Sequence, residues 1–174
     1  LILKPITRKT YAISAQIASY IPTAPTLSDA DQDALTDLYV RGTPPNTLRA
    51  YARDLIYITA WADAAFGKPL AWPAREDVAL RFILDHSRSL DDVNPQDPAV
   101  ATAEALISQG LCKSRACPAP ATLDRRIASW RAFHRMKNLA SPFEAPLLRQ
   151  TRAKARKAAA RRKTPKSANP ITRE

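Results

Sequence analysis

The stretch from Thr43 to Gly67, TPPNTLRAYARDLIYITAWADAAFG, constrains the fold more than any other part of the sequence. Thr43 can cap its first turn, or Asn46 a slightly later one, and Pro44 and Pro45 suit a turn whose N–H groups have no partner. Gly67 can adopt the left-handed conformation that ends a helix. Apolar residues recur at helical spacing between these ends, at Leu48, Tyr51, Ala52, Leu55, Ile58, Ala62, Ala65 and Phe66. The pattern predicts a long helix with one buried face, against which the rest of the chain packs.

Helix signals recur along the remaining chain, which contains no alternating strand pattern and no internal repeat. Ser28 can cap a helix over residues 28–42, with Leu35, Leu38 and Tyr39 as its apolar stripe. Further helices are expected over residues 75–89, 99–109, 120–138 and 144–163. The sequence therefore predicts an all-α fold, a compact bundle of about four to five helices with a basic C-terminal helix. We expect an N-terminal arm (residues 1–27), a helical domain (28–148) and a basic helix with a linker (149–174).

Positive charge is concentrated in the last third of the chain. The formal net charge is +11. Residues 1–110 carry 10 basic and 13 acidic side chains, whereas residues 111–174 carry 17 basic and 3 acidic ones. A basic region of this kind usually meets a polyanion, and it has few large apolar residues that could enter a membrane surface. We therefore expect a nucleic-acid partner.

Several other functional classes lack the residues that they need. Cys112 and Cys117 are the only cysteines, which argues against a disulfide framework and for a reducing cytoplasm. His86 and His134 are too few and too scattered to complete a zinc site. The sequence shows no paired-carboxylate pocket, glycine-rich phosphate loop, nucleophile motif or membrane-spanning run, and we expect no signal peptide. The sequence predicts no catalytic site, no metal site and no cofactor, and it favours His134 as a packed core histidine.

Two helix starts, one capped by Thr43 or Asn46 and the other by Thr122, combine polar caps with arginines. Such a start can bind phosphate through charge and backbone N–H groups together, and arginine and asparagine can also read base edges in a major groove. A basic helix near the C-terminus adds charge without sequence specificity. The candidate DNA-binding residues are Thr43, Asn46, Thr47, Arg49, Arg53, Thr122, Arg125, Arg126, Arg131, Arg135, Arg152, Arg156, Arg161, Arg162 and Lys163.

The same two segments carry a family resemblance. The first follows a pattern of Asn-Thr-hydrophobic, then Tyr, Asp-Leu and Trp, which reads here Asn46, Thr47, Leu48, Tyr51, Asp54, Leu55 and Trp61. The second begins with Thr and runs through basic and hydrophobic positions to His and Pro, which reads here Thr122, Leu123, Arg126, Ile127, Trp130, His134 and Pro142. Over about residues 28–174 the chain resembles the SAM-like, N-terminal core-binding domain of tyrosine recombinases of the phage integrase family.

The resemblance implies a helical bundle that clamps one side of duplex DNA, with the helices that start near Thr43 and Thr122 facing the major groove. It also implies a parent enzyme that breaks and rejoins DNA through a phosphotyrosine, and that associates with itself on DNA. The family's catalytic residues lie in a C-terminal domain that this sequence does not include, so Tyr51 is expected in the core and not as a nucleophile. The segment 91–120 departs from the family pattern as a long insertion.

Two other functions fit the same residues. One is a catalysis-free DNA- or RNA-binding adaptor that acts through its basic tail. The other is a protein-interaction bundle whose tail binds an acidic partner. For the leading hypothesis we expect a cytoplasmic, DNA-associated protein encoded by a bacterium or a phage.

Overall fold

The computed structural model describes residues 15–163, and the side chains of residues 15–160. After a short helical turn at residues 15–18, the elements are α2 (Asp29–Arg41), α3 (Pro45–Phe66), α4 (Glu76–Asp85), α5 (Pro98–Ser108), α6 (Pro120–Met136), the 3-10 helix η1 (Pro142–Glu144) and α7 (Pro146–Lys163). The described residues contain no strand, so the predicted all-α class is confirmed. The expected linker after residue 163 lies outside the described residues.

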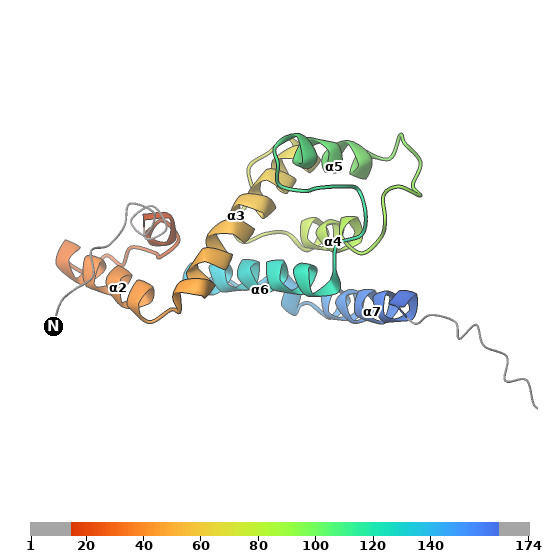
Figure 1. The fold of residues 1–174 in the computed structure, drawn as a ribbon. Coiled ribbons are helices and arrows are strands. Elements are labelled where there is room, and N and C mark those ends of the chain that lie inside the picture. Colours follow the sequence, from red (N-terminus) through yellow and green to blue (C-terminus); the bar gives the residue numbers. More distant parts are fainter. Residues whose placement is uncertain (1–14, 164–174) are drawn as a thin grey trace, which may run out of the picture.

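α3 is the element against which the other helices are arranged. Its 22 residues span about 33 Å. Figure 1 shows it running from the end of α2 to α5, with α6 crossing its first half and α7 lying beneath α6. Gly67 ends the helix at φ 63°, and its N–H bonds to the carbonyl of Asp63. The left-handed stop expected from the sequence is therefore confirmed.

Aromatic side chains from three helices form the main core. The rings of Trp61 on α3 and Phe82 on α4 have centroids 4.9 Å apart, and Phe82 lies 5.4 Å from Trp130 on α6. Edge-to-face packing of this kind adds to the free energy gained by burial alone. Leu148, which is fully buried, joins α7 to the same cluster.

A second apolar cluster joins the first turns of α3 to the end of α6. Leu48 and Leu55 pack there with Phe133, together with Ile17 and Ile21 from before α2. Ile17 and Ile21 are buried, so the part of the expected arm that the structure describes contributes to the core.

α2 is capped as predicted, but its apolar stripe is not buried. The Ser28 hydroxyl accepts from the Asp31 N–H, and the Asp31 carboxylate accepts from the Ser28 N–H in return. Leu38 is 58% exposed and Tyr39 is 37% exposed, whereas Leu35 packs partly against the second cluster. The expectation that all three face a core was wrong for Leu38 and Tyr39.

Three predicted helix caps are also wrong. α3 begins after Pro44 without a side-chain cap, because the Thr43 hydroxyl donates instead to the carbonyl of Tyr39. Asn46 lies inside the helix, where its side-chain oxygen accepts from Arg49. Thr122 lies in the third position of α6, which begins at Pro120. In both helices a proline stands near the start, and its ring fixes the backbone angle of that turn without any cap.

Candidate nucleic-acid interface

The two segments that carry the family resemblance meet at a buried carboxylate. Asp54 is 1% exposed on α3. One of its oxygens accepts from the Arg125 guanidinium, and the other accepts from the Ser129 hydroxyl at 2.7 Å. Arg125 and Ser129 lie one turn apart on α6, so both can face the same partner. This group locks α3 against α6, and sequence reasoning did not find it because its members are more than 70 positions apart.

Arg126 points in a different direction from its neighbour Arg125. Its guanidinium lies over the ring of Tyr57, 3.4 Å from the centroid. Burial is the main cause that lowers the pKa of Arg126 and also raises the pKa of Tyr57 to about 12. The Tyr57 hydroxyl donates in turn to Nε2 of His86 at 2.6 Å, because Nδ1 of that ring donates to the carbonyl of Phe82. Burial lowers the pKa of His86 to about 4, so the ring is neutral at pH 7.

The two predicted helix starts do not lie side by side. The first turns of α6 contact the middle of α3, through Arg125 with Asp54 and Arg126 with Tyr57. The first turns of α3 lie instead near the end of α6, where the rings of Tyr51 and Phe133 have centroids 5.7 Å apart. The two helices therefore cross each other, and their first turns lie apart.

Both crossing helices carry exposed arginines. Arg49 and Arg53 are exposed on successive turns of α3, and Arg135 is exposed on α6. Within residues 15–160, the side chains of Arg53 and Arg135 form no hydrogen bond or ion pair. Arg125 is one-third exposed at the border between the two helices. Arg49 bonds only to the neutral side chain of Asn46, so Arg49, Arg53 and Arg135 have no carboxylate partner within residues 15–160, whereas Arg125 is paired with Asp54.

Much of the predicted charge of α7 is already paired inside the fold. Arg152 and Arg156 both approach Asp124 of α6, and Arg156 does so with two nitrogens. Arg131 and Arg149 both bond to Glu144. Three of the candidate arginines on α6 and α7 (Arg131, Arg152 and Arg156), together with Arg149, thus hold these helices and η1 together. The side chains of Arg161, Arg162 and Lys163 lie outside the described residues.

The remaining candidate DNA-binding residues lie near the start of α3. Thr43 and Thr47 are partly exposed near the start of α3, and Asn46 is exposed beside them.

His134 is fully buried, as expected: its Nδ1 donates to the carbonyl of Trp130, and its Nε2 accepts from the N–H of Ala74 at 3.1 Å. Tyr51 is half-buried against the second cluster, so the expectation that it packs in the core holds in part.

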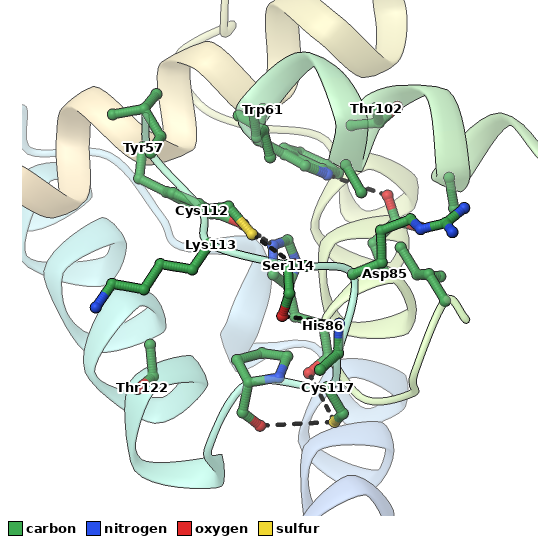
Figure 2. Close-up of a pocket in the computed structure, with 18 of the residues that line it drawn as sticks. Tyr57, Trp61, Asp85, His86, Thr102, Cys112, Lys113, Ser114, Cys117 and Thr122 are labelled. Atoms are coloured by element: carbon green, nitrogen blue, oxygen red, sulfur yellow. Dashed lines mark hydrogen bonds between the residues drawn. The ribbon is translucent and has the colours of Figure 1, made fainter. Parts of the chain in front are cut away.

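A pocket of about 520 Å³ opens between α3, α4, α5 and the loop that leads into α6. Figure 2 shows Tyr57 and Trp61 on one wall, Asp85 and His86 on another, and the loop with Cys112 crossing in front. α5 and this loop both lie in the segment 91–120, which the family pattern does not match. The sequence predicted α5 but not the pocket, because the walls of the pocket come from four separate segments of the chain.

Comparison of the chain with protein-family models, characterised proteins and solved structures gives no match. In the part of the chain that the structure describes, no helix has the length and apolar character needed to cross a membrane. No cluster of three or more potential metal ligands occurs among the same residues.

Proposed function

We propose that this chain binds duplex DNA, in the manner of the core-binding domain of a tyrosine recombinase. The catalytic step of the parent enzyme would belong to a separate domain. The observation that carries the proposal is that the crossing helices α3 and α6 expose Arg49, Arg53 and Arg135 without a carboxylate partner among the described residues, together with the sequence resemblance in those two helices.

The charge balance of these helices supports a polyanionic partner. Residues 43–60 and 120–138 hold seven basic side chains against two acidic ones. Asp54 and Asp124 are the two acids, and both are engaged by arginines. Of the acids on α3 and α6, only Asp63, exposed in the last turn of α3, has no arginine partner among the described residues. A helix pair with exposed arginines can place them on successive phosphates or in a groove.

Duplex binding at this surface should depend steeply on salt. If about four phosphates are contacted, affinity should fall about 150-fold between 50 and 200 mM salt, because each contact releases counterions. Fluorescence anisotropy of a labelled duplex across a salt series gives this slope directly.

Arg53→Gln is the decisive variant, because Arg53 is exposed and its side chain makes no hydrogen bond or ion pair within residues 15–160. It should weaken binding and lower the magnitude of the salt slope by about one. Lys68→Gln is the matched control, since it removes one exposed charge at the opposite end of α3. Arg125 is a poor choice for this test, because its loss also disturbs Asp54. Identical duplex affinity and slope for Arg53→Gln, Arg135→Gln and the wild type would exclude this surface.

A truncation at residue 148 separates the proposal from the adaptor hypothesis. If the truncated chain remains folded and loses all duplex affinity, the basic tail alone would account for binding. If it keeps sensitivity to Arg53→Gln, the crossed helices contribute as proposed.

A further inference from the structure

The pocket between α3, α4, α5 and the 110–119 loop has the size of a small-molecule site. Its volume of about 520 Å³ lies within the range that such ligands occupy. Apolar and aromatic side chains form much of its lining, with Tyr57 and Trp61 on α3 and Ala103 and Leu106 on α5. A flat apolar body can therefore be buried there.

The polar groups of the inner walls are already satisfied by one another. Tyr57 donates to His86, and the Trp61 indole donates to the Asp85 carboxylate at 3.1 Å. The other oxygen of Asp85 accepts from Arg81 at 2.7 Å, so its charge is balanced within α4. These walls offer few free hydrogen bonds to a ligand and no unbalanced negative charge.

The polar side chain of the lining that remains available to a ligand is positively charged. Arg126 lines the pocket without a carboxylate partner, since Asp54 is engaged by Arg125 and Ser129. Arg126 is only partly buried, so an anionic group of a ligand in the pocket can meet its guanidinium. Hydrogen bonds between a guanidinium and a carboxylate or phosphate are stronger than those between neutral groups.

Two further features at the mouth of the pocket add to this positive character. Lys113 is exposed in the lining, and its side chain makes no ion pair within residues 15–160. Ala119 and Thr122, at the start of α6, also line the pocket, and that start has no side-chain cap. The positive end of the α6 dipole, at an uncapped start, attracts anions.

From this arrangement we infer that the pocket binds a small organic anion, with a flat apolar body against Tyr57 and Trp61 and a carboxylate or phosphate beside Arg126. This inference does not rest on DNA binding. A duplex phosphate can meet the exposed surface of α6, whereas the inner walls of the pocket accept only a small molecule.

Binding of 2-naphthoate tests the inference, with 2-naphthamide as the neutral analogue of the same shape. Isothermal titration should show saturable one-to-one binding of 2-naphthoate, and at least tenfold weaker binding of 2-naphthamide. In two-dimensional NMR spectra, the amide signals of residues 110–119 should shift on addition of 2-naphthoate. Adenosine monophosphate, titrated in parallel, distinguishes a phosphate from a carboxylate preference.

Arg126→Met should weaken 2-naphthoate binding at least tenfold, because it keeps an apolar stem and removes the charge. Lys113→Gln should weaken binding two- to threefold, and its exposed position keeps this test independent of folding. Lys68→Gln, at an exposed residue that does not line the pocket, should bind as the wild type does. Equal affinity for the acid and the amide would overturn the inference. So would displacement of 2-naphthoate by inorganic phosphate at equal affinity, or unchanged binding by both folded pocket variants.

Discussion

Replacement of Arg125 by alanine should destabilise the protein through Asp54. Asp54 is almost fully buried, and Arg125 supplies the only positive charge that bonds to it among the described residues. The variant would leave a buried carboxylate with Ser129 as its one remaining side-chain donor. Breaking a buried ion pair on one side costs about 3–5 kcal/mol. Because Arg125 is one-third exposed, water can reach the site in the variant, and we expect a loss of about 2–3 kcal/mol.

The loss is large against the total stability expected of such a domain, about 5–15 kcal/mol. Urea unfolding can be followed by the fluorescence of Trp61 and Trp130, which are both buried in the main core. Arg135→Ala is the matched control on the same helix, and it should change the free energy of unfolding by less than about 0.5 kcal/mol. A thermal scan should show Arg125→Ala melting about 4–12 °C lower.

A double-mutant cycle identifies the cause of the loss. Asp54→Asn removes the charge that Arg125 balances but keeps an oxygen that can accept from Ser129. If the buried carboxylate is the source of the cost, Asp54→Asn in the Arg125→Ala background should restore about 1 kcal/mol or more. If Arg125→Ala proves as stable as the control, or if the two losses simply add, Asp54 does not lock α3 to α6 as described.

Two further predictions concern the core. Burial lowers the pKa of His86 to about 4, below its ordinary 6.5, so the unfolded chain takes up the proton first. The stabilisation from neutral His86 is complete above pH 6.5 and is lost as pH falls towards 4; it should decline by about 2 kcal/mol from pH 7 to pH 5. Urea unfolding at both pH values should show a smaller decline for His86→Gln, and an unchanged one would contradict the assignment. Leu148→Ala should cost about 2–5 kcal/mol because Leu148 is fully buried, whereas Leu147→Ala, at a position 55% exposed, should cost less than about 0.5 kcal/mol in the same assay.

Helix positions and the main apolar faces could be predicted because they depend on local sequence. Leu123, Ile127, Trp130 and His134 follow one another at steps of three or four residues, the spacing of one helix face, and all four are buried. Gly67 marked the end of α3 because a glycine, which has no Cβ, readily adopts the positive φ that ends a helix. Signals of this kind need no knowledge of which helix packs against which.

The failed predictions share a dependence on tertiary contacts. Asp54 and Ser129 looked like ordinary polar residues, and they become a buried pair only when α3 crosses α6. Leu38 looked like a core residue, but no element of the described structure covers that side of α2. Thr43 had the chemistry of a cap, yet its hydroxyl bonds back to α2. Local sequence allowed each alternative, and the packing of the helices decided among them.

The neighbouring residues Arg125 and Arg126 show how one helix can serve two sites. Successive residues of a helix point about 100° apart. Arg125 therefore reaches Asp54 at the border of the exposed surface, while Arg126 lies over Tyr57 at the pocket. A phosphate of duplex DNA and a small organic anion would meet different sides of α6. Because Arg53 serves only the first proposal and Lys113 only the second, each proposal can fail while the other stands.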